Sequence, residues 1–174
     1  MKEYIDAFDY AGHICKALKK GILLTTSADG NTNTMTIGWG KIGIEWNKPV
    51  FIAYVRESRH TYQMLKKSGA FTVNIPYGSI DPAILSYCGK KSGRDTNKIQ
   101  DLCLTPIPSD NIEAPAILEL PLTLECKVIY TQEQDLSAVP APLRSRFYCV
   151  SDDEHADMHT AFYGEIVSAY LITP

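Results

Sequence analysis

The sequence lacks several features that assign a protein to a membrane, to a secreted fraction or to nucleic acid. No apolar run is long enough to span a bilayer, and the first ten residues carry acids where a signal peptide would be apolar. The net charge of −3 gives no reason to expect binding to nucleic acid or to acidic lipid head groups. These absences predict a cytoplasmic protein whose partners include neither nucleic acid nor a membrane.

Common catalytic and cofactor signatures are also missing. There is no Gly-x-Gly-x-x-Gly, no phosphate loop ending in Gly-Lys-Ser/Thr, and no Gly-x-Ser-x-Gly around a serine. The five cysteines form no Cys-x-x-Cys and no zinc-type spacing with histidine, which favours reduced thiols. A doubly wound dinucleotide fold and a serine hydrolase are therefore not indicated.

Strand patterns outnumber helix patterns along the 174 residues, a length typical of one domain spanning 1–174. The strand candidates lie at 22–27, 33–40, 50–55, 70–75, 122–131, 147–150 and 161–172. Helices are expected at 5–20, from residue 58 or 59 to 69, and at 80–88, with Asp81 as N-cap. Because many strands lie at hairpin spacing and no βαβα alternation occurs, we expect a mainly β protein, a closed antiparallel barrel with peripheral helices.

The segment Arg-Glu-Ser-Arg-His-Thr at 56–61 combines two guanidinium groups, two hydroxyls and the start of a helix. Forked donors, hydroxyls and the positive end of a helix dipole are what a phosphate group needs. The alternative is a solvated helix start, with Ser58 as N-cap and two surface arginines. Spacing alone leaves both interpretations open.

The strand at 33–39 places Met35, Ile37 and Trp39 on one face and small or polar residues on the other. Its backbone could hydrogen-bond the edge of a flat heterocycle that Trp39 covers. Met and aromatic residues at strand spacing more often belong to the core, and the pattern by itself favours the core.

Two further groups of residues could carry chemistry. Cys88 precedes a basic, Gly-rich loop at 89–98, so it could be an activated thiol, although an inert buried thiol is the simpler interpretation. His155, Asp157 and His159 could hold a divalent metal if they were helical, but the segment has the composition of an acidic loop. We therefore predict neither a catalytic side chain nor a metal site, and the roles of Cys88, His155 and His159 stay open.

Several motifs, taken in order, resemble the flavin reductase-like, FMN-binding split-barrel family, and its flavoredoxin branch in particular. They are Met-Thr-Ile-Gly-Trp-Gly at 35–40, the Lys48-Pro49 turn, Arg-Glu-Ser-Arg-His-Thr at 56–61, Phe-Thr-Val-Asn-Ile-Pro at 71–76, Cys-Gly-Lys-Lys-Ser-Gly-Arg-Asp at 88–95 and Lys98. The similarity covers residues 21–98, and Gly-Glu-Ile-Val at 164–167 is similar to the family's late strand. Residues 100–150 match only loosely.

The resemblance implies a six-stranded antiparallel split β-barrel that forms a homodimer, with FMN near the subunit interface. It also implies the residues of a flavin site. Asn33, Met35, Thr36, Ile37 and Trp39 would lie along the ring, and Arg56, Ser58, Arg59 and Thr61 would bind the phosphate. Asn74 would lie near the ribityl chain or the ring edge, Ser92, Gly93 and Lys98 would complete the pocket, and Phe162 would neighbour the ring.

The function implied by the resemblance is electron transfer from NAD(P)H or a redox protein, through bound FMN, to an acceptor. The chemistry would be that of the cofactor, so no side chain need act as an acid or base. The alternatives are a non-catalytic FMN-binding electron-transfer module without NAD(P)H turnover, and a homologue that has lost flavin. The polar pocket residues are all present in the sequence, which argues against loss.

Overall fold

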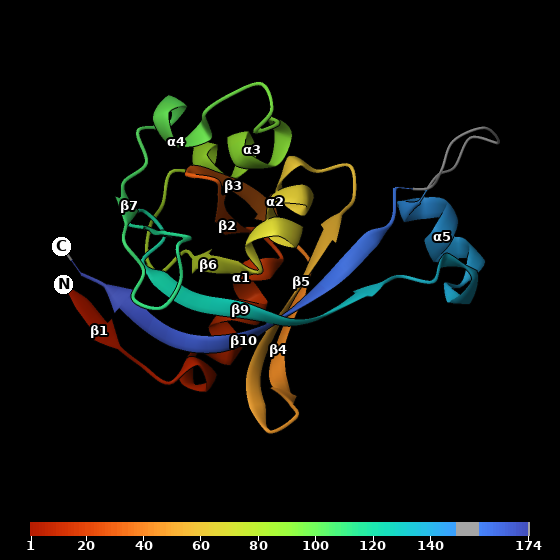
Figure 1. Ribbon diagram of the computed structural model, residues 1–174, viewed down its shortest axis with the longest axis horizontal. Helices are drawn as coiled ribbons and strands as arrows, with labels where there is room; N and C mark the ends of the chain where they lie inside the picture. The colour runs from red at the N-terminus through yellow and green to blue at the C-terminus, as the bar shows by residue number, and fades with distance from the viewer. Residues whose placement is uncertain (149–156, 174) are drawn as a thin grey trace.

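One curved antiparallel sheet forms the body of the protein (Figure 1). The computed structural model describes residues 1–148 and 157–173. Within them the sheet has eight strands, which follow the order β3-β2-β6-β9-β10-β5-β4, with β1 paired to β10. A separate two-stranded ribbon pairs β7 with β8. The predicted mainly β, antiparallel architecture with peripheral helices is confirmed.

The element boundaries are as follows. The strands are β1 Lys2–Tyr4, β2 Ile22–Ala28, β3 Asn31–Ile37, β4 Gly40–Glu45, β5 Lys48–Arg56, β6 Ala70–Ile75, β7 Pro106–Ile107, β8 Ala116–Ile117, β9 Leu122–Glu133 and β10 His159–Ile172. The helices are α1 Ala11–Leu18, α2 His60–Ser68, α3 Pro82–Lys90, α4 Lys98–Asp101 and α5 Ala141–Phe147, with 3-10 turns η1 Ala7–Tyr10 and η2 Leu136–Ala138.

The sheet differs from the six strands expected in two places. β1 was not predicted because it is very short. β4 was not predicted because glycine separates its two isoleucines and charged residues flank them. The strand expected at 147–150 is also wrong in its first half, since Phe147 ends α5; residues 149 and 150 lie outside the described residues. The helix expected at 5–20 splits into η1 and α1.

The predicted N-cap of α3 is confirmed, whereas α2 begins after Arg59 and not with Ser58 as its N-cap. Asp81 accepts a hydrogen bond from the backbone N–H of Ala83 and so caps α3, with Pro82 at its first position. Gly69 ends α2 in a left-handed conformation, with φ of 63°. These caps fix where α2 and α3 begin and end beside β2 and β3.

The core lies inside the curve of the sheet, where apolar side chains of β2, β5, β6, β9 and β10 meet α1 and α2. All seven residues of β2 are buried, as expected for a strand covered on both faces. β9 and β10 bend around this core, and their register shifts at Gly164. A Cβ atom at Gly164 would lie 2.6 Å from the ring of Phe71, so only glycine permits this close approach.

Two residues expected at the flavin belong to this core instead. Asn74 has no exposed surface: its side-chain amide donates to Thr25 and Thr72 and accepts from the backbone N–H of Ile117. Phe162 is 1% exposed and packs edge-to-face on Tyr62 of α2. Both carry the right residue type at the expected place in sequence, but their strands turn them inward.

The two edge strands of the sheet, β3 and β4, are consecutive in sequence. Only Gly38 and Trp39 separate them. The chain therefore passes from one edge of the curled sheet to the other in two residues, and the split between the edges lies beside this crossing. Among the described residues the outer edge of β3 has no strand partner. Lys98 donates to the Thr34 carbonyl of this strand, and the remaining outward backbone groups are available to other partners.

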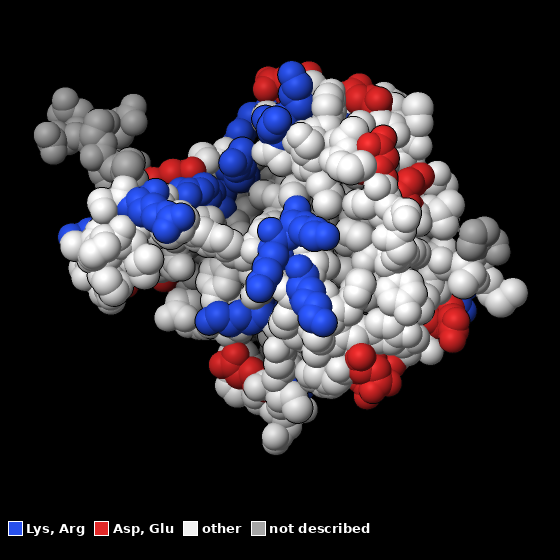
Figure 2. All heavy atoms as spheres, turned by 180° about the vertical axis from the view of Figure 1, so that it is seen from behind, with Lys and Arg blue, Asp and Glu red and all other residues white. Residues whose placement is uncertain are grey.

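Lysine and arginine side chains are concentrated on the face seen in Figure 2, which carries α1. They form a group near its centre and a row above it, while acidic side chains lie mainly around the periphery. A chain with a net charge of −3 thus presents one strongly positive face.

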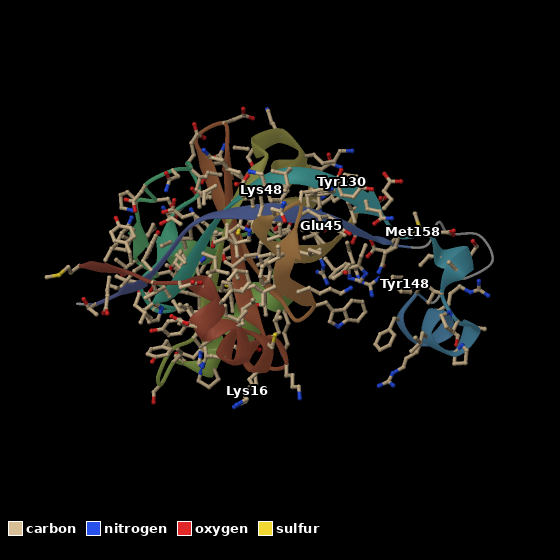
Figure 3. All side chains as sticks on the ribbon, turned by 90° about the horizontal axis from the view of Figure 1, so that it is seen from below. Lys16, Glu45, Lys48, Tyr130, Tyr148 and Met158 are labelled. Atoms are coloured by element: carbon tan, nitrogen blue, oxygen red, sulfur yellow. The ribbon has the colours of Figure 1, made fainter. Side chains whose placement is uncertain are left out.

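The far ends of β9 and β10 extend beyond the barrel as an arm that carries α5 (Figures 1 and 3). Tyr148 and Met158 lie at the base of this arm, on the side of the barrel that carries the crossing between β3 and β4. Within the described residues, no helix is both long and apolar enough to cross a membrane.

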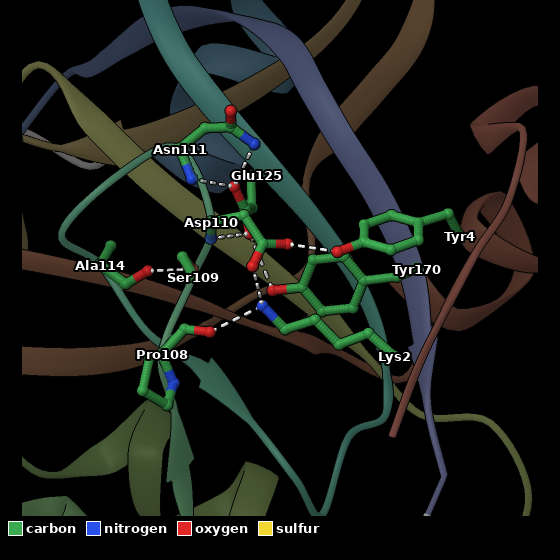
Figure 4. A network of polar contacts seen from close by, with 9 residues as sticks. All are labelled: Lys2, Tyr4, Pro108, Ser109, Asp110, Asn111, Ala114, Glu125 and Tyr170. Atoms are coloured by element: carbon green, nitrogen blue, oxygen red, sulfur yellow. Dashed lines mark hydrogen bonds and ion pairs between the residues drawn. The ribbon is translucent and has the colours of Figure 1, made fainter.

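A buried carboxylate fastens the loop between β7 and β8 to the sheet at the opposite end (Figure 4). Glu125 of β9 accepts hydrogen bonds from the backbone N–H groups of Asp110 and Asn111, from the Asn111 amide and from the hydroxyl of Tyr170. Because every acceptor is used, this carboxylate is stabilised without a cation. The network holds a loop that lies away from the candidate site.

Candidate functional site

Two hollows lie side by side along β3, and both are lined by Met35 and Arg59. The first, which we call the cationic hollow, has a volume of about 120 Å³ and is lined by Asn33, Met35, Ser58, Arg59, His60, Thr61, Cys88, Gly89, Lys91, Ser92, Gly93, Arg94 and Lys98. The second, the aromatic hollow, has a volume of about 190 Å³ and is lined by Met35, Thr36, Ile37, Gly38, Trp39, Tyr54, Arg56, Arg59 and His159.

Lys98 provides a buried positive charge to the cationic hollow. The side chain is 4% exposed, and its ammonium group donates to the backbone carbonyls of Thr34 and Cys88 at 2.8 and 3.1 Å. Among the described residues it forms no ion pair. Burial lowers the pKa of this ammonium, and the nearby Arg59 lowers it further. A buried cation without an anion is costly, and the hollow therefore favours an anionic occupant.

The N-terminus of α2 opens into the same hollow. Its N-cap residue, Arg59, makes no side-chain capping bond, so N–H groups of the first turn lack an intrahelical partner. Thr61 lies in that turn, and its hydroxyl accepts a hydrogen bond of 2.8 Å from the Asn33 amide. The hydroxyl proton of Thr61 is thereby free to donate to a ligand. Arg59 is exposed and lines both hollows.

The loop after α3 closes the other side of the cationic hollow. Arg94 donates to the backbone carbonyl of Ser58 at 3.0 Å, which fastens the loop to the β5–α2 turn. A Cβ atom at Gly93 would lie 2.2 Å from Oδ1 of Asn33 and 3.0 Å from the ring of His60. Glycine is required for this approach, and Ser92 and Gly93 thus reach the hollow as the sequence predicted.

Arg56 and Ser58 are arranged differently from the phosphate ligands that we expected. The Arg56 guanidinium donates to the backbone carbonyls of Phe147 and Asp157, at 2.8 and 2.7 Å. The Ser58 hydroxyl and N–H both donate to the Asp157 carboxylate, at 2.7 and 3.1 Å. These donors hold the segment before β10 against the β5–α2 turn. The free donors of the cationic hollow therefore come from Arg59, Thr61, Lys98 and the loop after α3.

The aromatic hollow has a flat, mixed lining beside the free edge of β3. Met35, Thr36 and Ile37 come from that edge, and Tyr54 from β5, two residues before Arg56. Trp39 is 39% exposed and lies between the ring of His159, with 4.7 Å between centroids, and the ring of Phe147. Such a slot can hold a planar ring against the strand, with backbone donors and acceptors along its edge.

His159 is held neutral at one wall of the aromatic hollow. Its Nδ1 lies 2.9 Å from the hydroxyl of Tyr148, which also donates to the side-chain oxygen of Gln134. The single hydroxyl proton of Tyr148 goes to Gln134, so the imidazole donates from Nδ1 and its Nε2 is an acceptor. Burial and the Arg56 charge lower the pKa of His159 to about 4.

Cys88 is an inert thiol in this structure. It is 1% exposed, and burial raises the pKa of the thiol to about 11, although Lys98 partly opposes the rise. The simpler of the two interpretations of this cysteine is therefore supported. His155 lies outside the described residues.

Most of the predicted site residues meet at the two hollows: all except Asn74 and Phe162 line one or both of them. The sequence interpretation missed Tyr54, His159, His60 and Arg94 as lining residues. Tyr54 could have been found, since it precedes Arg56 by two positions and so shares its strand face. His159 could not, because its place depends on the pairing of β10 with β5 across a hundred residues.

Comparisons with known proteins agree with the fold. A family model described as a flavin reductase like domain matches residues 16–174. The flavoredoxin of Desulfovibrio vulgaris (Miyazaki F) is 26% identical, with a TM-score of 0.65 over 87% of this chain and 68% of that one.

Two structures with lower identity show the fold. One is an FMN-binding domain of a flavin reductases-like enzyme from Shewanella baltica OS155 (17% identity, TM-score 0.64, 98% and 77% covered). The other is assigned as a flavin reductase with a split barrel domain, from Shewanella frigidimarina NCIMB 400. It is 20% identical, with a TM-score of 0.67, and the match covers 97% of this chain and 75% of that one. An uncharacterized protein of Archaeoglobus fulgidus is 28% identical over 106 residues, which span 61% of this chain and only 59% of that relative.

The low pKa of His159 predicts a fall in stability on mild acidification. Between about pH 6.5 and pH 4 the imidazole is protonated in the unfolded chain, where its pKa is near 6.5, but stays neutral in the folded protein. The free energy of unfolding is therefore highest above about pH 6.5 and decreases toward pH 4. We expect the urea midpoint to drop between pH 7 and pH 5, and the drop to be smaller in His159→Phe. His60, whose pKa is also lowered by burial, remains in both proteins as a common background. An identical drop in the variant would contradict a neutral His159.

Proposed function

Because the chain belongs to the flavin reductase-like family, we propose that it is an FMN-binding flavoprotein that takes electrons from NAD(P)H or a redox protein and passes them to an acceptor. The observation that carries the proposal is the buried Lys98 ammonium, which faces the cationic hollow without a carboxylate. A phosphate group with about two negative charges supplies the anion that this cation lacks.

The donors around the hollow fit a phosphate in number and kind. Arg59 offers a forked guanidinium, Thr61 a hydroxyl with a free proton, and the first turn of α2 its N–H groups. Ser92 and Lys98 complete the set from the opposite side. Two N–H donors of Arg56, and the hydroxyl and N–H of Ser58, already bind the segment before β10, so these two residues support the site by positioning β5 and the turn after it.

The aromatic hollow fits the ring of the same cofactor. Neither hollow alone reaches the roughly 300–1,000 Å³ typical of a ligand site, but Met35 and Arg59 line both, so one elongated ligand can occupy the pair. The free edge of β3 offers backbone N–H and C=O groups to the ring's heteroatoms. A phosphate at one end and a planar heterocycle at the other is the arrangement of FMN.

FMN bound here would supply two-electron and one-electron redox chemistry. The chain's own residues bind and orient it: the cationic hollow fixes the phosphate, and the β3 edge and Trp39 fix the plane of the ring. His159, neutral and with Nε2 as an acceptor, adds no positive charge to this end of the site. None of these residues has to act as a general acid or base.

Replacing Arg59 with alanine tests the phosphate site. We expect FMN affinity, measured by fluorescence titration, to fall about tenfold or more, as for the loss of one charge-assisted hydrogen-bonding group. The melting temperature of the apoprotein should change little, because Arg59 is exposed. Arg56→Ala is the matched control. It removes the bonds to the Phe147 and Asp157 carbonyls and should lower apoprotein stability more than Arg59→Ala does. Equal FMN affinity in Arg59→Ala and the parent protein would exclude this hollow as the phosphate site.

The electron donor is tested on purified protein reconstituted with FMN. Continuous oxidation of NADH or NADPH, followed at 340 nm, with and without added flavin, is expected for a reductase. A single stoichiometric reduction of the bound flavin without turnover identifies the alternative, a carrier that exchanges electrons with another protein. A colourless protein that takes up no FMN contradicts both.

We further propose that the chain forms a homodimer through aromatic residues at the tip of the β4–β5 hairpin. Trp46 is 57% exposed, lies 5.8 Å from Tyr130 and 6.3 Å from Tyr163 between ring centroids, and has Ile44 nearby in sequence with 71% exposure. Exposed aromatic groups of this kind mark protein contacts.

Sedimentation equilibrium is expected to show a dimer, and Trp46→Asp to shift it toward monomer. Tyr77→Asp, at a separate aromatic residue with 47% exposure, is the control and should leave the dimer intact. A monomeric parent protein at micromolar concentration would contradict the proposal.

A further inference from the structure

A third hollow adjoins the aromatic hollow on the side away from the cationic one. It has a volume of about 400 Å³ and shares three lining residues, Gly38, Trp39 and Tyr54, with the aromatic hollow. Its other walls come from the C-terminal half of α1 and from β4. We call it the lysine hollow, because Lys19, at the end of α1, and Lys41, of β4, both line it and no Asp or Glu is among its described lining residues.

The positive charge extends beyond the two lysines that line the hollow. Residues 11–20 contain Lys16, Lys19 and Lys20 and no acid. Residues three and four positions apart share one face of a helix, so Lys16 lies beside Lys19 and Lys20 on the surface of α1 and at its end. Lys16 extends away from the sheet (Figure 3). The charged group at the centre of the face in Figure 2 is consistent with this arrangement.

The lysines have no acidic partners to neutralise them. None of Lys16, Lys19, Lys20 and Lys41 forms an ion pair with a described residue. Lys41 stands over the ring of Tyr54, with Nζ 5.7 Å from the centroid, and hydrogen bonding by Tyr54 raises the pKa of Lys41. The cation is thus held at the wall shared by the lysine hollow and the aromatic hollow.

We propose that the lysine hollow binds the phosphates of a nicotinamide dinucleotide, and that Lys19 and Lys41 make the chain prefer the 2′-phosphorylated form, NADPH, over NADH. The proposal rests on the proposed function, because the ring of that donor would have to reach a flavin in the aromatic hollow. In the reaction the donor gives a hydride to oxidised FMN, a proton from water completes the reduced flavin, and oxidised NADP⁺ leaves.

Three observations favour a dinucleotide over an acidic redox protein. Lys19 and Lys41 line a hollow whose volume is within the range of small-ligand sites, whereas a protein partner needs a broad contact surface. That space joins the candidate ring site through Trp39 and Tyr54, so a ligand bound by its phosphates there has a path to the ring. The 2′-phosphate adds up to about two negative charges, which raises the attraction of Lys19 and Lys41 for NADPH relative to NADH.

Binding of 2′,5′-ADP, which carries the distinctive phosphates of NADPH and no reducing group, tests the site without turnover. Isothermal titration of the FMN-reconstituted protein should give tighter binding of 2′,5′-ADP than of 5′-AMP. The double variant Lys19→Gln/Lys41→Gln should weaken it by about tenfold or more, as expected for lost charge-assisted contacts. Lys127→Gln, an exposed lysine on β9 outside all three hollows, should leave it unchanged.

The same variants separate this proposal from the proposed function. FMN affinity should be equal in Lys19→Gln/Lys41→Gln and the parent protein, and kcat/KM should fall further with NADPH than with NADH in the variant. Equal binding of 2′,5′-ADP and 5′-AMP, or displacement of FMN by either nucleotide, would overturn the lysine hollow as a donor site. So would lysine-dependent binding of an acidic redox protein with no nucleotide binding. Failure of FMN itself to bind would overturn the proposed function instead.

Discussion

The positions of the cationic, aromatic and lysine hollows follow from the way the two edges of the curled sheet approach each other. β3 and β4 are its two edges, and the chain connects them through Gly38 and Trp39 alone. So short a connection holds the edges close together at that point while leaving the outer edge of β3 unpaired. The cationic, aromatic and lysine hollows form a row along this split, and each is lined by β3, by the crossing, or by both. A sheet that closed fully would satisfy the β3 backbone internally and leave no slot for a planar ligand.

The electrostatic pattern along the split is uneven in a way that suits one elongated anionic ligand. The Lys98 ammonium is buried without an anion, whereas His159 is buried in its neutral form beside the charge of Arg56. A second permanent cation at the ring end would compete with the phosphate end for the ligand's negative charge. Burial and the charge of Arg56 remove this competition by lowering the pKa of His159, while the Tyr148–Gln134 pair selects the tautomer that donates from Nδ1.

The sequence could predict the parts of this arrangement that depend on local pattern. The strands expected at 22–27, 33–40 and 50–55, the N-cap of α3 and the end of α2 follow from short-range signals. The gathering of residues 33–39 with 59–61 and 92–98 was implied only by the family resemblance. Asn74 and Phe162 could not be assigned in this way, because the face that a strand residue presents depends on its partners across the sheet. The contacts of Arg56 and Ser58 with Asp157 could not be predicted either, because Asp157 lies about a hundred residues away and carries no pattern that links it to the turn.

The contacts of Arg56 have a consequence for how the arm and the site are coupled. Its guanidinium joins the carbonyl of Phe147, at the end of α5, to that of Asp157, just before β10, while its own strand supplies Tyr54 to two hollows. Phe147 in turn packs against Trp39, and Trp39 against His159. The arm is therefore fastened to the crossing by one cation and one aromatic stack. A displacement of α5 would disturb the ring slot through Phe147 and Trp39. The segment before β10 is also bound to Ser58, beside the phosphate donors, through the Asp157 carboxylate. The arm is thus coupled to both ends of the site.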